Sequence, residues 1–309
     1  NRGLIKEGEH PLKIAADQLV MDGVTILHTI GGDDTNTTAA DLSRFLKKNN
    51  YELTVVGLPK TIDNDVFPIA QSLGADTAAE QGALFFENIV NENTTSNRQL
   101  IIHEIMGRNC GWLTAATAYK YRERLKKKHF IDEIKLFKGK WDIHSIFIPE
   151  NKIKFEKECS RLKKIMDKYD CVNIFLSEGA GYDLIIKEAK DSKKNILYDA
   201  FGHVRLDDLN AGKWFAKKFG EKLNANKILI QKSGYFSRSA KANENDLKLI
   251  FSFCDYAVKS AKNNISGVIG VDEDNNKLSC IDFDRIKGGK PFDTSVDWFK
   301  NMIKEINKI

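Results

Sequence analysis

Short runs of Val, Ile and Leu alternate along the chain with longer amphipathic stretches, and this alternation constrains the fold more than any other feature. A buried parallel strand needs apolar residues on both faces, whereas a covering helix needs one apolar stripe. The pattern therefore predicts an α/β fold in which helices cover a mostly parallel sheet. We expect strands at 24–30, 53–58, 100–105, 145–148, 172–176 and 228–231. We expect helices at 11–21, 39–48, 75–92, 112–127, 155–169, 211–223 and 245–263, and a turn at 272–276.

Composition limits the classes of partner. With 309 residues, 42% of them hydrophobic, the chain is long enough to bury a core in one or two domains. Its 48 Lys and Arg residues against 43 Asp and Glu residues give a formal charge of +5, spread along the chain, which suits a small anionic substrate. The densest basic cluster, residues 122–128, is typical of a solvated helix end rather than of a nucleic-acid site. We expect no nucleic-acid partner.

The five cysteines lie far apart and form no zinc-binding spacing, so neither a disulfide framework nor a cysteine metal site is indicated. No apolar run is long enough to span a membrane, and residues 1–20 lack the apolar core of a signal peptide. The sequence therefore predicts a cytoplasmic protein without a membrane partner. His28 and His103 lie inside apolar strands, where a buried core histidine is the expected interpretation.

Almost every predicted strand ends in a polar or glycine-containing motif. In open α/β sheets ligands bind beyond the carboxyl ends of the strands, so such motifs can converge on one site. The motifs are GGDDTNT at 31–37, PKTIDND at 59–65, MGR at 106–108, SEGAG at 177–181 and KSGYFSR at 232–238.

Gly31 and Gly32 stand between a strand and a helix, where the backbone turns sharply and can present N–H groups to a phosphate. The alternative is a plain turn in which Asp34, Thr35 or Thr37 caps the helix.

In the second motif, Asp63 and Asp65 follow Lys60 and Thr61. A carboxylate beside a cation and a bound anion can take the proton of an attacking hydroxyl, while the cation offsets the charge of the transferred group. A turn-forming loop is the alternative.

The later motifs supply groups suited to a sugar phosphate. Arg108 at a strand tip suits phosphate or sugar oxygens, and Glu178 offers a carboxylate to hydroxyls. Tyr235 with Lys232 and Arg238 adds a phenol and two cations. A surface ion pair, a capping turn and a salt-bridged loop are the respective alternatives.

Taken together and in this order, these motifs resemble the phosphofructokinase family nearly from end to end, and IKGGKPFD at 286–293 resembles its pyrophosphate-using branch. The resemblance implies two Rossmann-like three-layer α/β/α domains with the active site in the cleft between them. It implies a phosphate-donor domain at 1–110 and a fructose 6-phosphate domain, with a C-terminal return, at 111–309. The implied reaction is reversible, magnesium-dependent transfer of phosphate to the 1-hydroxyl of fructose 6-phosphate, a step of glycolysis and gluconeogenesis.

The resemblance also assigns roles to residues. Asp63 would be the base, Asp33 would hold Mg²⁺, and pyrophosphate would lie on Gly31, Gly32, Asp33 and Asp34. The other implied substrate-binding residues are Thr61, Ile62, Asp65, Met106, Gly107, Arg108, Glu178, Tyr235 and Arg238. In family members a neighbouring subunit completes the 6-phosphate site, so a homodimer or homotetramer is implied.

Donor choice rests on Asp34 and Lys60. ATP-using bacterial relatives have glycine at the position of Asp34 and usually have glycine at the position of Lys60. A carboxylate at the loop tip would repel the α-phosphate of a nucleotide, because two unit charges about 4 Å apart at an effective dielectric near 20 cost roughly 4 kcal/mol. Lys60 would supply positive charge to the smaller donor. We therefore expect pyrophosphate as the donor, with an ATP-dependent enzyme as the alternative.

Family members begin with a strand and a glycine-rich loop, which are not found before Lys13. We therefore expect the chain to lack an N-terminal part, and a noncatalytic sugar-phosphate-binding subunit is the alternative from another class. Arg98 lies one place out of register with the basic residue expected upstream of MGR and receives no role.

Overall fold

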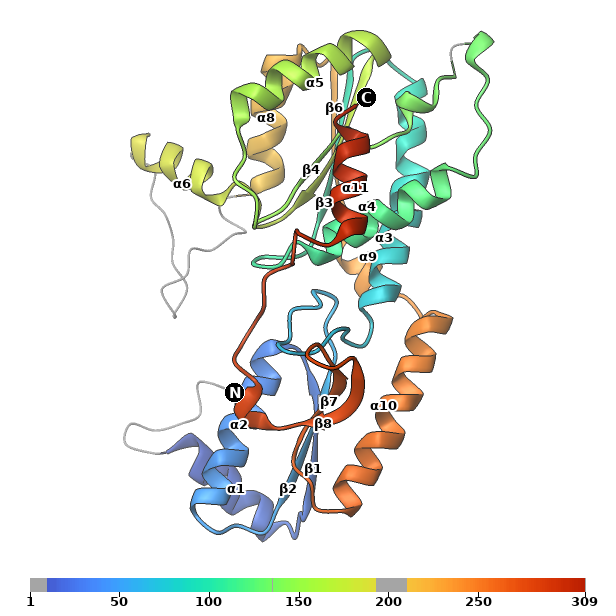
Figure 1. Ribbon diagram of the computed structural model, residues 1–309. Helices are drawn as coiled ribbons and strands as arrows, with labels where there is room; N and C mark the ends of the chain where they lie inside the picture. The colour runs from blue at the N-terminus through green and yellow to red at the C-terminus, as the bar shows by residue number, and fades with distance from the viewer. Residues whose placement is uncertain (1–9, 135, 193–209, 309) are drawn as a thin grey trace. The chain divides into compact units, whose positions relative to one another are not determined.

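The computed structural model describes residues 10–134, 136–192 and 210–308, so the first nine residues lie outside it. The chain divides into two compact units, one of residues 1–75 with 242–290 and one of residues 76–241 with 291–309. Each contains a four-stranded sheet covered by helices (Figure 1), which confirms the expected α/β class. Within the described residues, no helix is long and apolar enough to cross a membrane.

In the first unit the strand order is β1-β2-β7-β8. The first three strands are parallel and β8 returns as a hairpin, with the expected turn at 272–276 joining β7 to β8. The strands are β1 (Ile26–Gly31), β2 (Thr54–Pro59), β7 (Gly267–Asp272) and β8 (Lys277–Ile281). The helices are α1 (Pro11–Met21), α2 (Asp33–Lys48) and α10 (Glu244–Lys262), with the 3₁₀ turn η4 (Phe283–Arg285).

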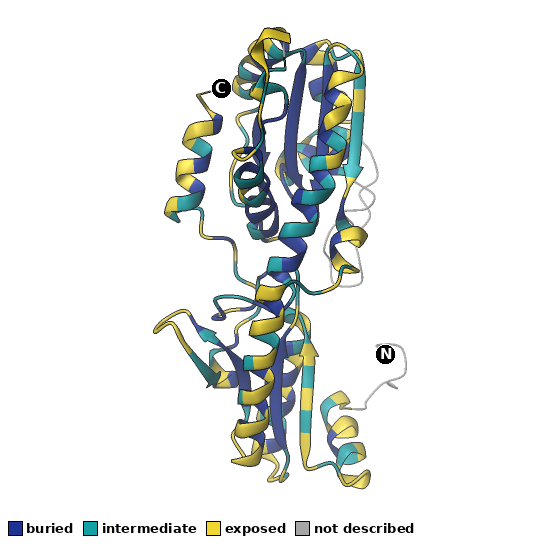
Figure 2. Cartoon of the chain, turned by 90° about the vertical axis from the view of Figure 1, so that its right-hand side faces the viewer, coloured by how far each residue is buried: buried dark blue, intermediate teal, exposed yellow. Residues whose placement is uncertain are grey.

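Successive strand residues point to opposite sides, and helices cover both faces of β2 and β7, whereas alternate residues of the edge strand β1 are exposed. Val55 of β2 and Val268 of β7 pack in one cluster with α1 and α2, whereas Val56 and Ile269 pack with α10 in another. Figure 2 shows buried central strands, edge strands with exposed residues, and helices with one exposed side.

The second unit has the strand order β4-β5-β3-β6, entirely parallel. Its strands are β3 (Gln99–Ile105), β4 (Ser145–Phe147), β5 (Cys171–Ser177) and β6 (Lys227–Lys232). Its helices are α3 (Ala75–Ile89), α4 (Trp112–Leu125), α5 (Phe155–Tyr169), α6 (Tyr182–Asp191), α8 (Ala211–Leu223), α9 (Gly234–Arg238) and α11 (Asp297–Ile306). The 3₁₀ turns are η1 (Val90–Thr94), η2 (Asp132–Ile134) and η3 (Lys138–Lys140).

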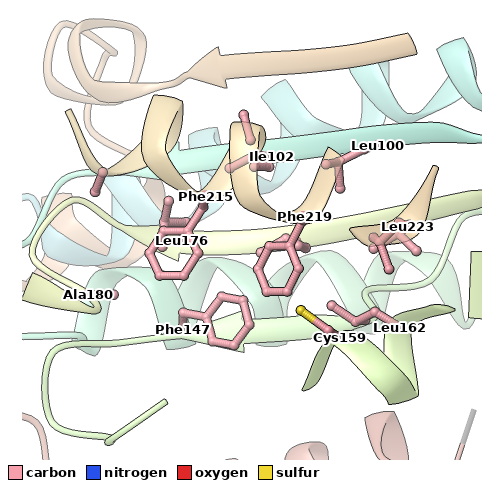
Figure 3. Packing of buried hydrophobic residues seen from close by; sticks show 14 of the residues in the cluster. Leu100, Ile102, Phe147, Cys159, Leu162, Leu176, Ala180, Phe215, Phe219 and Leu223 are labelled. Carbon is pink, nitrogen blue, oxygen red and sulfur yellow. The ribbon is translucent and has the colours of Figure 1, made fainter. Parts of the chain in front are cut away.

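A phenylalanine cluster forms the core under α5 and α8 (Figure 3). Phe147 of β4 stacks on Phe215 and Phe219 of α8, with ring centroids 5.4 and 5.8 Å apart. Offset aromatic stacks add to the burial of these large side chains and fix the helix against the strands.

The units are not divided at residue 110. β3 pairs along its length with both β5 and β6, which places it in the second unit, and β7 returns late in the chain to pair with β2 in the first. Strand pairing between distant segments therefore sets the division, and composition gives no sign of it.

The six expected strands are confirmed with ends shifted by at most two residues, and the helices at 11–21, 155–169 and 211–223 are confirmed at both ends. The helix expected at 39–48 begins at Asp33 instead, and the one expected at 75–92 ends at Ile89 and continues as η1. Polar residues 33–38 carry no apolar stripe, so periodicity reveals α2 only from Ala39. β7, β8, α6, α9 and α11 were not specified by the sequence patterns.

His103 is a fully buried core residue, as expected. The same expectation is wrong for His28, which is exposed because β1 is an edge strand with alternate residues uncovered. Its ring stacks on Phe86 and its Nε2 lies 2.8 Å from the Ser233 hydroxyl. Burial lowers the pKa of His103 to about 3, because the charged imidazolium loses its hydration.

This burial predicts a loss of stability in acid. Between the ordinary pKa of 6.5 and the folded value of about 3, the unfolded chain binds a proton that the folded chain does not, so stability falls as pH falls through that window. From pH 7.5 to pH 5 the His103 contribution should be about 2 kcal/mol. Urea unfolding at the two pH values should show a smaller loss for His103→Gln than for the wild type. Equal losses would contradict this origin.

Candidate active site

Two loops of the first unit begin side by side at the carboxyl edge of its sheet (Figure 1). We name residues 31–34 the glycine loop and residues 60–65 the aspartate loop. Gly31 pairs with Pro59 in the parallel register, and the Lys60 N–H donates to the Gly31 carbonyl over 2.7 Å. A Cβ on Gly31 would lie 2.2 Å from Thr35 Oγ1, so the turn accepts no side chain there.

Asp33 and Asp34 lie in the first turn of α2, for which Gly32 is the N-cap. The positive end of the helix dipole favours carboxylates at this position. Burial, and then the neighbouring Asp34, raise the pKa of Asp33, while the Thr37 hydroxyl and the Gly289 N–H partly offset the rise. Asp34 is exposed. The expected capping alternative is therefore not the arrangement found, since no side chain caps α2.

Hydrogen bonds within the aspartate loop and from Ser72 fix its conformation. The Asp63 N–H donates to Thr61 Oγ1 over 3.2 Å, and the Ser72 hydroxyl donates to the Thr61 carbonyl over 2.9 Å. Asn64 has φ 55° and accepts the Ser72 N–H over 2.7 Å. Thr61, Ile62, Asp63 and Asp65 are half-buried at this tip, whereas Lys60 is exposed.

Residues 286–290, which we name the return loop, complete this edge. The Lys290 N–H donates to the Asp65 carbonyl over 2.7 Å, and a Cβ on Gly289 would lie 3.5 Å from Asp33 Oδ2. The Lys290 ammonium donates to the Ile69 carbonyl over 2.5 Å and pairs with Glu273. The return loop thus holds Asp33 and Asp65 together, a role that the sequence did not reveal.

Asp33 and Asp65 can contribute to a cation site. Burial, and then Asp33, raise the pKa of Asp65, and its Oδ1 is buried with no hydrogen-bond partner in the described part of the chain. Across the described residues no three His, Cys, Asp or Glu side chains gather to hold a metal ion. One or two carboxylates completed by waters and substrate phosphates is the arrangement that Mg²⁺ accepts, so the residues fit that ion.

In the second unit, the MGR and SEGAG motifs interlock where β3 and β5 end. The Glu178 N–H donates to the Ile105 carbonyl over 2.9 Å, and the Ser177 hydroxyl donates to the Gly107 carbonyl over 2.5 Å. Gly107 has φ 131°, and a Cβ there would lie 2.4 Å from the Cys110 carbonyl oxygen, so only glycine fits. Its N–H donates to Glu178 Oε1 over 3.3 Å, and Arg108 is left exposed at the rim.

The KSGYFSR motif at 232–238 lies next to the MGR motif at 106–108. Met106 atoms would lie 3.2 Å from a Cβ on Gly234, the first residue of α9. Tyr235 is 81% exposed and Arg238 is exposed, so both present polar groups to solvent. Lys232 pairs instead with the buried Glu104 over 2.6 Å, which gives this lysine a structural partner.

Arg98 has a structural role. Its guanidinium donates to the Leu223 and Asn224 carbonyls over 2.5 and 2.8 Å and pairs with Asp167 over 2.9 Å. Cations at a helix C-terminus satisfy its last carbonyls. Arg98 therefore fixes the end of α8.

Each sheet thus carries its predicted residues at its own carboxyl edge. The first unit brings together Gly31, Gly32, Asp33, Asp34, Lys60, Thr61, Ile62, Asp63 and Asp65, and the second brings together Met106, Gly107, Arg108, Glu178, Tyr235 and Arg238. Sequence reasoning assigned no site role to Asn36 or to the return loop, although the latter lies within the IKGGKPFD segment at 286–293. Asn36 lies within GGDDTNT, and its spacing of four from Ala40 is the signal that it faces the core.

Residues 1–261 match the family described as phosphofructokinase. The chain belongs to the phosphofructokinase family. Over 308 residues it is 58% identical to pyrophosphate–fructose 6-phosphate 1-phosphotransferase of Methylomonas methanica, covering 99% of this chain and 75% of that protein. It is 51% identical to the protein of the same name from Mastigamoeba balamuthi, with the same two coverages.

More distant members include ATP-dependent 6-phosphofructokinase 7 of Arabidopsis thaliana, 26% identical over 77% of this chain and 46% of that protein. The crystal structure of pyrophosphate-dependent phosphofructokinase from Marinobacter aquaeolei has a TM-score of 0.67 at 19% identity, covering 96% of this chain and 70% of that one. This likeness shows a phosphofructokinase fold, as the sequence resemblance implied.

Proposed function

We propose that this phosphofructokinase transfers a phosphoryl group from pyrophosphate to the 1-hydroxyl of fructose 6-phosphate, giving fructose 1,6-bisphosphate and phosphate. The observation that carries the proposal is the second carboxylate of the glycine loop. Asp34 is exposed at the first turn of α2, directly after Asp33 and beside the strand that leads to Lys60. High identity to proteins named for the pyrophosphate reaction supports the same donor.

The proposed chemistry assigns one proton transfer. The 1-hydroxyl oxygen attacks the nearer phosphorus of pyrophosphate, Asp63 accepts the hydroxyl proton, and inorganic phosphate leaves. Lys60 supplies positive charge to the donor, and Gly31 and Gly32 offer backbone N–H groups. Thr61, Ile62 and Asp65 complete the aspartate loop.

The second unit would bind the sugar phosphate. Arg108 suits phosphate or sugar oxygens, Glu178 accepts hydrogen bonds from sugar hydroxyls, and Met106 and Gly107 line the same edge. Tyr235 and Arg238 would grip the 6-phosphate. Their exposure supports a homodimer or homotetramer in which a second copy completes this site.

Mg²⁺ is the cation that we propose for this reaction. Asp33, with Asp65 beside it, would hold the ion, and the bound ion neutralises charge on the donor phosphates. The five cysteines are free, which supports a reducing compartment such as the cytoplasm.

Asp34→Gly tests the choice of donor. Removing the loop-tip carboxylate should raise kcat/KM for ATP at least about tenfold, because repulsion of the α-phosphate is relieved. Steady-state rates with ATP and with pyrophosphate measure the ratio of the two donors. Asp41→Asn, which neutralises an exposed carboxylate further along α2, serves as the control. An unchanged ratio in Asp34→Gly would remove the charge argument.

The activity itself is tested with fructose 6-phosphate and Mg²⁺, comparing pyrophosphate and ATP as donors. The assay is run on this chain and on a version extended at its N-terminus to the length of the relatives. Turnover with pyrophosphate alone supports the proposal, whereas preference for ATP favours an ATP-dependent enzyme. Binding of fructose 6-phosphate without turnover by either version would favour a noncatalytic subunit.

A further inference from the structure

Asn36 is fully buried in the second turn of α2, beneath the glycine loop. Its side-chain amide donates to the Gly31 carbonyl over 2.9 Å and to the Gly32 carbonyl over 2.8 Å. The Gly31 carbonyl also receives the Lys60 N–H, and the Gly32 carbonyl receives the backbone N–H of Asn36 over 3.1 Å. Both carbonyls are therefore held by two donors each.

Fixing these carbonyls also fixes two N–H groups. In a planar trans peptide the C=O and the N–H of the next residue point in opposite directions. Because the Gly31 and Gly32 carbonyls point toward Asn36, the N–H groups of Gly32 and Asp33 point away from it, out of the helix N-terminus. Donors at this position, together with the helix dipole, favour an anion.

The amide orientation is determined by its partners. A flipped side chain would place an oxygen against two carbonyl oxygens, so the nitrogen must face the glycine loop. The Oδ1 atom is buried without a hydrogen-bond partner in the described part of the chain. It faces Gly57 of β2, where a Cβ would lie 2.8 Å from it. A buried oxygen without a hydrogen bond destabilises the fold, so the Oδ1 atom does not explain why an amide stands here. The two N–H donors to the glycine loop do.

We propose that Asn36 is a positioning residue for phosphoryl transfer, which orients the N–H groups of Gly32 and Asp33 toward pyrophosphate. This inference rests on the proposed function, since it takes the glycine loop as the donor site. No contact of Asn36 with the substrate is involved, because its side chain is buried on the helix side of the loop.

Asn36→Asp is the direct test, since it keeps the shape of the side chain but loses both N–H donors. We expect kcat/KM for pyrophosphate to fall about 100-fold, as when a preorganised donor to a reacting anion is lost. KM for fructose 6-phosphate should change less than about twofold, because a purely donor-side effect leaves sugar binding intact. Calorimetry should show weaker binding of pyrophosphate.

Asn93→Asp is a matched control. Asn93 is 1% exposed, and its amide donates over 2.8 Å to the Lys140 carbonyl and to Asn173 Oδ1, while its own Oδ1 is likewise buried without a partner in the described part. It lies in η1 of the second unit, outside every motif assigned to the site. Asn93→Asp should lower the melting temperature by an amount comparable to that of Asn36→Asp, without changing kcat/KM for pyrophosphate.

Gly57→Ala disturbs the same amide without removing it and decides the matter if Asn36→Asp does not fold. Its new methyl group would press on Asn36 Oδ1, so kcat/KM for pyrophosphate should fall in the same sense by about tenfold. Folded Asn36→Asp or Gly57→Ala protein with pyrophosphate constants within about twofold of wild type would overturn the positioning role. An inactive wild type would instead count against the proposed function, and calorimetry with pyrophosphate would then test Asn36 by binding alone.

Discussion

Replacing Asp63 by asparagine is expected to lower kcat for the pyrophosphate reaction about a thousandfold, the effect of losing a general base. The amide keeps the size of the side chain but cannot take the proton of the 1-hydroxyl. Asp63 is half-buried in a loop held by Thr61 and Ser72, so the exchange should leave the backbone in place. Steady-state rates with pyrophosphate, with KM for both substrates, measure the effect.

A neutralised carboxylate elsewhere in the same unit controls for charge alone. Asp282 is exposed and accepts the Asp284 N–H over 2.8 Å at the start of η4, so Asp282→Asn should keep nearly full activity. Retention of more than about a tenth of kcat by Asp63→Asn would assign the proton to another group.

Replacing Arg122 by methionine is expected to lower the free energy of unfolding by about 4 kcal/mol, because removal of one partner strands a buried charge. Arg122 of α4 binds both Asp142 carboxylate oxygens over 2.8 and 3.1 Å, with the two side chains 11% and 6% exposed. It also donates to Glu305 of α11 over 2.8 Å. Urea unfolding followed by circular dichroism measures the loss.

Two further variants separate the buried charge from general damage. Arg122→Met combined with Asp142→Leu should recover much of the stability, since no uncompensated charge then remains. Lys126→Met removes an exposed pair with Glu123 at the C-terminal end of the same helix and should cost less than about 1 kcal/mol. A double variant no more stable than Arg122→Met would show that lost packing, not charge, explains the effect.

The helix at Asp33–Lys48 shows where pattern-based prediction fails. Its apolar stripe begins at Ala39, but the helix starts six residues earlier, with two carboxylates and a buried amide in its first turns. Periodicity of apolar residues does not detect the polar residues 33–38, and only the spacing of four between Asn36 and Ala40 places Asn36 on the buried face. The role of the return loop was not predicted for a different reason, since its contacts to Asp33 and Asp65 join residues more than 200 positions apart.

The sequence by itself determined the α/β class, the six strands found by their apolar runs, and the polar motifs that follow the strands. These properties are local, because a strand tip and the residues after it are adjacent in the chain. Only the tertiary structure decided the division into units, the pairing of the glycine and aspartate loops, and the bonds from Asn36 to Gly31 and Gly32. Those features depend on strand order, register and burial, which are set by contacts between distant segments and leave no periodic trace in the sequence.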